Sequence, residues 1–270
     1  MGEGPLRVET DGRGVTTVTL DRPEVRNAFD AALITGLRET FQGFAVGDGT
    51  RVVVLTGEGT AFCAGADLNW MSGMVDKGFD EVDKGFDENV ADSRVFEEML
   101  RAVHDCPHPL VARVNGHAFG GGVGLVAAAD VAIGAEEALF SFSEVRLGLA
   151  PAVISPYVLE KIGLAAARNL MLTGERFNAS AAAALGLLTR AVPGEELDAA
   201  VEMVVTDLLL GAPEAQAAVK RLLREVAGRS PAEAAPVTTE MIARLRVSDE
   251  GQEGMRAFFE KRAPSWHVEG

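Results

Sequence analysis

Two glycine-containing turns carry the residues of this chain that could do chemistry. Residues 57–68 (GEGTAFCAGADL) and 115–125 (NGHAFGGGVGL) each follow an apolar run typical of a buried strand. In the second turn, the adjacent glycines 120–122 precede a helical pattern, so backbone N–H groups at a positive helix end stay open to a ligand. Such a turn binds a phosphate or stabilises a developing oxyanion, and a tight packing turn is the alternative interpretation.

A third segment sets one carboxylate among apolar residues. Glu144 lies within residues 140–151 (FSFSEVRLGLAP), and burial raises the pKa of a glutamate and suits it to proton transfer. A surface glutamate paired with Arg146 is the alternative from this segment alone. Backbone donors and one carboxylate together suit proton chemistry next to a carbonyl group.

Other motifs exclude several kinds of site. No Gly-Lys-Ser/Thr follows the triple glycine, so it is not a phosphate loop of that type, and Leu125 stands where a dinucleotide fingerprint needs glycine. The four histidines show no metal-binding spacing, and neither Cys63 nor Cys106 has an obvious histidine to orient it. We therefore expect no metal ion, no nicotinamide and no other cofactor.

Length, composition and charge limit the class of protein. A chain of 270 residues, 47% of them hydrophobic, forms one large domain or a domain with an appendage. With 25 Lys+Arg against 40 Asp+Glu, the net charge of −15 argues against binding to nucleic acid or to an anionic membrane. It does not exclude a small anion, which a few local donors can hold. Two cysteines, no signal peptide and no apolar run of membrane-spanning length predict a soluble cytoplasmic protein.

The first half of the chain alternates predicted strands and helices. We expect strands at 15–20, 51–56, 110–114 and 131–133, the second of them buried on both faces. Residues 30–44 have helical spacing with Asp30 as the N-cap, and a further helix runs through Ala127. This order predicts right-handed βαβ-type connections with helices packed on a sheet.

The pattern changes near Ser155, after which strand signals nearly vanish. Ala- and Leu-rich helices are expected at 181–184, 198–210, 213–226 and 231–245, the last two beginning at prolines that suit the first helical position. We divide the chain into an α/β core at 1–195 and a helical C-terminal oligomerisation subdomain at 196–270, with no linker between them.

One segment is an exact tandem duplication. The heptad at 75–81 (VDKGFDE) is repeated at 82–88, which is too short for a coiled coil and carries a glycine in each copy. The simpler hypothesis is a duplication tolerated in a surface loop. The alternative is a mobile lid over a site, with Phe79 or Phe86 as its apolar contact.

Five motifs, taken together and in order, resemble one known family. They are Arg22-Pro23-x-x-x-Asn27-Ala28, residues 62–68, Asn115-Gly116 with the triple glycine, residues 143–149, and Glu253-Gly254 with Phe258-Phe259-Glu260-Lys261-Arg262. From about Leu6 to Trp266 the chain resembles the enoyl-CoA hydratase/isomerase (crotonase) superfamily. The resemblance implies an α/β fold built as a crotonase-like spiral of ββα repeats, with a helical C-terminal trimerisation region. It also implies a homotrimer or a dimer of trimers.

The resemblance further implies a site for an acyl-CoA thioester. The N–H groups of Ala66 and Gly121 match the oxyanion hole that holds the thioester oxygen, and Glu144 matches a catalytic acid/base. Fixed amide dipoles stabilise the enolate-like charge without reorganising. In the family, one segment also lines the path of the CoA adenine and pantetheine. The residues that match it here are Ala64, Gly65, Ala66, Asp67 and Leu68.

Two of the matched positions have expected roles outside the chemical step. Asp67 is expected to hold the turn by hydrogen bonding rather than to react. Lys261 matches a basic position that meets the CoA phosphates, often in a neighbouring subunit.

The chain departs from the family pattern at one catalytic position. Hydratases of the family carry two glutamates, and Gly124 stands where the first would be. Hydration then requires Glu144 to activate water and return the proton itself, or a water network in place of the missing carboxylate. One glutamate also suits isomerisation of a Δ3- to a Δ2-enoyl-CoA, and hydration of another acyl chain is the other alternative among enzymes. A catalytically degenerate acyl-CoA-binding subunit is a third hypothesis.

Three stretches, 67–71, 122–126 and 149–157, resemble the bacterial branch that hydrates methyl-branched glutaconyl-CoA esters. This implies interconversion of 3-methylglutaconyl-CoA and 3-hydroxy-3-methylglutaryl-CoA, as in leucine metabolism, or of related terpenoid acids. Such substrates carry a free carboxylate, for which Arg146, Arg94 and His117 are candidate partners. RNA binding, a property of some relatives, is disfavoured by the net charge of −15.

Overall fold

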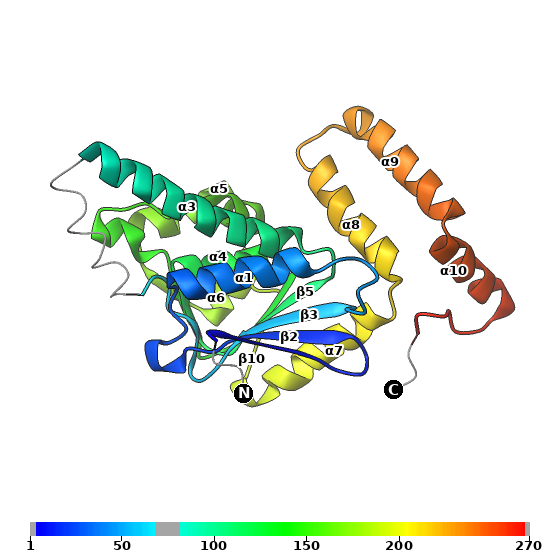
Figure 1. The fold of residues 1–270 in the computed structure, drawn as a ribbon, viewed down its shortest axis with the longest axis horizontal. Coiled ribbons are helices and arrows are strands. Elements are labelled where there is room, and N and C mark those ends of the chain that lie inside the picture. The colour runs from blue at the N-terminus through cyan, green and yellow to red at the C-terminus, as the bar shows by residue number, and fades with distance from the viewer. Residues whose placement is uncertain (1–3, 68–81, 268–270) are drawn as a thin grey trace.

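The computed structural model describes residues 4–67 and 82–267 of the chain, which form two sheets and a series of helices (Figure 1). The six-stranded sheet has the order β1-β2-β3-β5-β7-β10. Its strands are β1 (Leu6–Thr10), β2 (Val15–Leu20), β3 (Val52–Gly57), β5 (Leu110–Val114), β7 (Val131–Ala135) and β10 (Arg190–Val192). Strand β1 pairs antiparallel with β2, and the other neighbours are parallel.

A smaller sheet of four strands has the order β4-β6-β8-β9. Its strands are β4 (Ala61–Cys63), β6 (His117–Phe119), β8 (Leu139–Ser141) and β9 (Arg176–Asn178). Two successive units each contain a strand of the large sheet, then a strand of the small sheet, then a helix. They are β5-β6-α4 (Gly121–Ala128) and β7-β8-α5 (Ser155–Thr173). The predicted spiral of ββα repeats is therefore confirmed, and so are the strands and helices predicted for the first half.

Helices cover both faces of the large sheet. On one side lie α1 (Ala31–Gly43), α3 (Val82–Asp105), α4 and α5, and on the other lies α7 (Leu197–Leu209) (Figure 1). Every residue of β3 is buried, as the uninterrupted apolar run predicts for a strand covered on both faces. The predicted cap of α1 is confirmed, since the Asp30 side chain accepts a hydrogen bond from Leu33 N at 2.8 Å.

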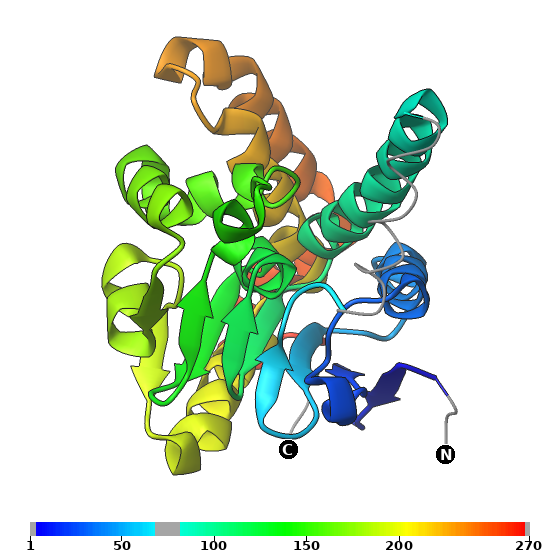
Figure 2. The same cartoon turned by 90° about the vertical axis from the view of Figure 1, so that its left-hand side faces the viewer.

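Helix α7 belongs to the α/β core by its packing. Leu197, Ala200, Val201 and Val205 are buried against Val52, Val54, Val111 and Ile133 of the sheet. The predicted division at 195/196 falls just before this helix. The helices that stand apart from the sheet are α8 (Pro213–Val226), α9 (Pro231–Val247) and α10 (Asp249–Glu260) (Figures 1 and 2).

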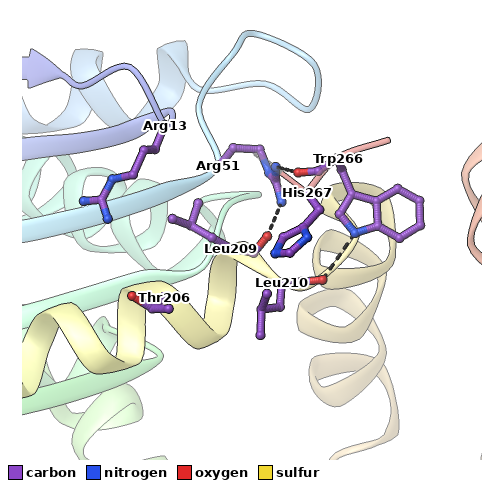
Figure 3. A pocket seen from close by; sticks show the side chains of 7 residues that line it. All are labelled: Arg13, Arg51, Thr206, Leu209, Leu210, Trp266 and His267. Carbon is purple, nitrogen blue, oxygen red and sulfur yellow. Dashed lines mark hydrogen bonds between the residues drawn. The ribbon is translucent and has the colours of Figure 1, made fainter. Parts of the chain in front are cut away.

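Cationic side chains tie these C-terminal helices to the core. In α8, Lys220 Nζ donates to Asp130 Oδ2 at 2.6 Å and to His108 O at 3.0 Å. After α10 the chain returns to the start of β3, where the Arg51 guanidinium donates to Trp266 O at 2.7 Å and to Leu209 O at 3.0 Å (Figure 3). A cation that binds backbone carbonyls of both α7 and the tail holds the two together.

The second half contains short elements that sequence patterning missed. They are β8, β9 and β10, together with the 3-10 turns η3 (Ser143–Leu147) and η4 (Gly194–Glu196). The helix predicted at 181–184 is confirmed as α6 (Ala179–Leu185). A further 3-10 turn, η1 (Pro23–Val25), follows β2. Three-residue strands have no readable alternation, and β10 exists because β7 offers it a free edge.

The surface-loop hypothesis for the duplicated heptad is wrong for its second copy. Residues 82–88 form the first turns of α3, and the Phe86 side chain is 66% exposed. A glycine in a helix costs about 1 kcal/mol, which the buried later turns of this 24-residue helix offset. The first copy, with Phe79, lies outside the described residues. Within residues 4–67 and 82–267, no helix is long and apolar enough to cross a membrane.

Candidate active site

The two glycine turns predicted from sequence lie against each other. Parallel pairing sets Ala61 of β4 beside His117 of β6, so both strands deliver their turns to the same edge of the small sheet. A Cβ on Gly65 would stand 2.9 Å from the carbonyl oxygen of Phe119, and one on Gly122 would overlap the carbonyl oxygen of Cys63. Glycine is thus required where the turns touch, because any side chain would push them apart.

Each turn presents one backbone N–H group without an acceptor among the described residues. Phe29 N donates to Gly65 O at 2.7 Å and Asp67 N donates to Phe29 O at 2.9 Å, so the N–H of Ala66 between them points away from Phe29. Gly121 is the first residue of α4, where helix N–H groups have no acceptor within the helix. No hydrogen bond from either N–H to another described residue is present. These are the two N–H groups predicted to form the oxyanion hole.

Aromatic side chains fix the backbone around Gly121. A Cβ on this residue would stand 2.8 Å from Phe96 Cζ and 2.9 Å from Phe29 Cε2. The two rings pack edge to face with centroids 5.3 Å apart. Phe29 also carries the backbone bridge to Ala66, so one residue contacts both halves of the predicted oxyanion hole. Sequence reasoning missed Phe29 and Phe96; the position of Phe29 directly after the Asn27-Ala28 motif was the available signal.

Glu144 lies beside the same turn. It is the second residue of η3, and its Oε1 stands 3.0 Å from the place of a Cβ on Gly120. Gly120 N donates to Ser141 O at 2.9 Å, which joins the turn to the strand that leads into η3. The Oε2 atom is buried and has no hydrogen-bond partner among the described residues. Burial raises the pKa of this carboxyl group, against a smaller opposing effect of its own backbone N–H.

The position of the missing second carboxylate is closed by an aliphatic side chain. Gly124 lies one helical turn after Gly120, to whose carbonyl oxygen it donates at 3.3 Å. A Cβ on Gly124 would stand 2.5 Å from Ile154 Cγ2 and 3.6 Å from Leu100 Cδ2. Both side chains are almost fully buried. Ile154 lies within the stretch 149–157, for which the sequence predicted no contact with position 124.

Polar contacts hold the first turn from behind. Asn27 is fully buried, and its side-chain amide donates to Glu58 O and Ala61 O, both at 2.9 Å, while its oxygen accepts from Arg22 N at 2.9 Å. Arg22 Nη2 lies 3.2 Å from Asp67 Oδ2. The buried carboxylate of Asp67 thus pairs with the Arg22 guanidinium. The sequence likewise predicts that Asp67 holds the turn by hydrogen bonding rather than reacting.

The other predicted site residues fall into three groups. Ala64 and Gly65 lie in the turn after β4, with Ala64 N donating to Arg26 O at 3.0 Å. Leu68 lies outside the described residues. Lys261 is exposed in the left-handed conformation at the end of α10, a helix that packs on α8 and α9 rather than beside Gly120.

The three candidate partners for a substrate carboxylate lie apart from one another. Arg146 is exposed in η3, two residues from Glu144, with its Nε 3.2 Å from the place of a Cβ on Gly174. Arg94 is exposed on α3. His117 begins β6, and its Nδ1 accepts from Leu139 N at 3.1 Å, so that nitrogen is used within the sheet.

No group of three or more metal-binding side chains occurs in the part of the chain that the structure describes. A cavity of about 260 Å³ lies between α7 and the C-terminal tail, lined by Arg13, Arg51, Thr206, Leu209, Leu210, Trp266 and His267 (Figure 3). Arg13 there is paired with Asp11 and Glu202. The residues fit for chemistry are those around Gly120: two N–H groups for an oxyanion and one carboxylate to move a proton.

Comparison with known proteins finds relatives that match nearly the whole chain. A family model described as enoyl-CoA hydratase/isomerase matches residues 10–269. The crystal structure of an enoyl-CoA hydratase from Shewanella pealeana is similar with 40% identity and a TM-score of 0.90, covering 97% of this chain and 96% of its own. That of an enoyl-CoA hydratase from Mycobacterium smegmatis has 32% identity and a TM-score of 0.88, covering 98% and 100%. Mevalonyl-coenzyme A hydratase sidH of Aspergillus fumigatus is 30% identical over 256 residues, 93% of this chain and 91% of the relative.

Proposed function

The chain belongs to the enoyl-CoA hydratase/isomerase family, and we propose that it hydrates and dehydrates a methyl-branched enoyl-CoA with Glu144 as its one acid/base group. The observation that carries this proposal is the Glu144 carboxylate, whose Oε1 lies against Gly120 while its buried Oε2 has no partner among the described residues. A buried carboxylate oxygen without a hydrogen-bond partner, close to two open N–H groups, is costly for folding and is typical of a functional site.

In this proposal the N–H groups of Ala66 and Gly121 hold the thioester oxygen. In dehydration, Glu144 takes the proton from the thioester α-carbon, and negative charge moves to that oxygen. The electron pair then forms the α,β double bond as the β-carbon releases its hydroxyl group. The Glu144 carboxyl group returns the same proton to that hydroxyl group, which leaves as water. Hydration is the reverse sequence of steps, so the same carboxylate removes and returns the proton in both directions.

For the acyl group we propose 3-methylglutaconyl-CoA, interconverted with 3-hydroxy-3-methylglutaryl-CoA. Support comes from the resemblance of residues 67–71, 122–126 and 149–157 to the branch that acts on such esters. It also comes from the mevalonyl-coenzyme A hydratase relative, because a mevalonyl group carries a methyl and a hydroxyl group on the same carbon. Of the three candidate partners for the free carboxylate, Arg146 is the one that shares η3 with Glu144.

A second candidate, isomerisation of a 3-enoyl-CoA, is favoured by one specific observation. Position 124 has no side chain and Ile154 fills its place, so Glu144 is left alone to move protons. Isomerisation needs only that: Glu144 takes a proton from carbon 2 and returns it to carbon 4, while the double bond moves into conjugation.

The experiment is a panel assay of the purified protein with crotonyl-CoA, 3-methylglutaconyl-CoA and a 3-enoyl-CoA, repeated with Glu144→Gln. We expect turnover of the branched ester, loss of at least a hundredfold in kcat for Glu144→Gln, and little change in its acyl-CoA affinity. Glu137→Gln, an exposed glutamate between β7 and β8, is the matched control. Turnover of the 3-enoyl-CoA alone would favour isomerisation, and binding without turnover would favour an acyl-CoA-binding subunit.

We also propose that α8 to α10 form the contacts of a homotrimer, which two such rings could extend to a hexamer. These helices expose Val219, Leu223, Val247, Phe258 and Phe259, each by half or more of its surface. In such an assembly Lys261 would reach the CoA phosphates of a neighbouring subunit. No cofactor is required by this proposal, and full activity should survive exhaustive chelation.

A further inference from the structure

Gly124 and Ile154 form a complementary pair one helical turn from the Glu144 carboxylate. We propose that Ile154 determines the reaction specificity by closing the position at Gly124 from which a second acid/base group, or a water molecule bound to it, would reach the substrate beside Glu144. This inference rests on the proposed function, because it concerns how many groups move protons at the same site.

The geometry of α4 sets Gly120 and Gly124 on the same face. Residues four apart on a helix project in nearly the same direction, and Gly124 N donates to Gly120 O at 3.3 Å. At Gly120 the direction of a Cβ meets Glu144 Oε1 at 3.0 Å, and at Gly124 it meets Ile154 Cγ2 at 2.5 Å. The carboxylate and the isoleucine therefore lie along one face of one helix, a single turn apart.

Ile154 is held firmly in this place. It is 2% exposed, and its carbonyl oxygen accepts from Val158 N at 3.1 Å at the start of α5. Leu100 of α3, which is 0% exposed, closes the same space from the other side at 3.6 Å from the place of the Cβ. An aliphatic wall has no partner for a water molecule, which needs two or more polar groups to stay bound.

Among the described residues, no charged side chain influences the pKa of Glu144. Burial raises this pKa, and the opposing influence comes from the residue's own backbone N–H. A second carboxylate would raise that pKa further by repulsion and would split the two titrations. With Glu144 as the one titrating group that the described residues place at Gly120, the reaction should depend on one ionisation.

The test compares Ile154→Ala, Gly124→Glu and the double variant Gly124→Glu/Ile154→Ala with the wild type. Ile162→Ala is the matched control, because it shortens a second buried isoleucine of the same core, which lies within α5. Two quantities are measured: thermal unfolding, and kcat/KM for hydration of crotonyl-CoA and of the branched ester between about pH 5 and pH 9.

The wild type and Ile162→Ala should lose activity only on the acid side, through one ionisation. Gly124→Glu alone should lower Tm markedly, because its Cβ meets Ile154, and the added Ile154→Ala should restore much of that loss. The double variant should show a bell-shaped pH profile and hydrate crotonyl-CoA about tenfold faster or more. Ile154→Ala alone should raise the ratio of hydration to isomerisation with a 3-enoyl-CoA.

Three results would overturn the inference. One is a bell-shaped profile for the wild type, and another is a folded double variant with the wild-type profile. The third, which applies even if the double variant does not fold, is an unchanged product ratio for Ile154→Ala. Failure of the proposed function is distinguishable, since it would appear as no turnover of any thioester by the wild type. The rescue of Gly124→Glu in thermal unfolding would still report on the Gly124–Ile154 contact.

Discussion

The Oε1 atom of Glu144 stands 3.0 Å from the place that a Cβ on Gly120 would occupy. Gly120 also has φ +49 and ψ −120, a backbone conformation that side chains disfavour. Glycine is therefore required here twice, once for the turn that exposes Gly121 N–H and once for the approach of the carboxylate. The proposed catalytic base and half of the proposed oxyanion hole are therefore positioned by the same residue.

Replacing Gly120 by alanine should lower kcat/KM by about a hundredfold, because the added Cβ displaces Glu144 and strains the turn. The measurement is steady-state kinetics with the preferred thioester. Gly47→Ala is the control, since Gly47 has φ +89 but no atom near the place of its Cβ. The control should lose about 1 kcal/mol of stability and no activity. Equal activity of both variants would contradict the positioning role.

The stability of Glu144→Gln relative to the wild type should depend on pH. Burial raises the pKa of the Glu144 carboxyl group in the folded state above its unfolded value. Below the pKa that Glu144 has in the unfolded chain, the carboxyl group is protonated in both states and does not lower the stability of the wild type. As the pH rises through the higher pKa of the folded state, the wild type loses stability. The glutamine variant should match the wild type in Tm at acid pH and exceed it at neutral pH. A constant difference, or the same behaviour in Glu137→Gln, would contradict this.

Asn27 should be a major stabilising residue of the first turn. Its fully buried side chain makes three hydrogen bonds of 2.9 Å to the backbone of Arg22, Glu58 and Ala61. Replacing it by alanine should cost about 3 kcal/mol in the free energy of unfolding, measured by denaturant titration. Asn27→Gly keeps the backbone at φ +57 without strain. If strain rather than hydrogen bonding dominates, the glycine variant will be nearly as stable as the wild type.

The oligomer proposed for this chain should depend on the last helix. Phe258 and Phe259 are 78% and 79% exposed in the single chain. Burying each side chain in a subunit interface contributes about 1.5–3 kcal/mol to association. Changing both to aspartate should reduce the mass measured by light scattering to that of a monomer. Met203→Asp changes an exposed apolar residue on α7 instead and should leave the mass unchanged. A monomeric wild type would refute the proposed trimer.

Much of the fold was predictable because its signals are local. The buried run of β3, the helical spacing of α1 and the Asp30 cap each depend on neighbouring residues, and all three agree with the structure. Prediction failed for β9 and β10, three-residue strands whose existence depends on pairing with distant partners. It also placed the second copy of the heptad in a loop, because a glycine in each copy outweighed the helical signal of the residues that follow.

By itself the sequence determined which residues could react: the N–H groups of two glycine turns, one glutamate in an apolar segment, and no second carboxylate at position 124. Only the tertiary structure decided what surrounds them. The contact of Gly65 with Phe119, of Glu144 with Gly120 and of Ile154 with Gly124 each joins residues from different strands and helices. Such contacts depend on how the two sheets and α3 to α5 pack, and side-chain volume decides them rather than any periodic pattern along the chain.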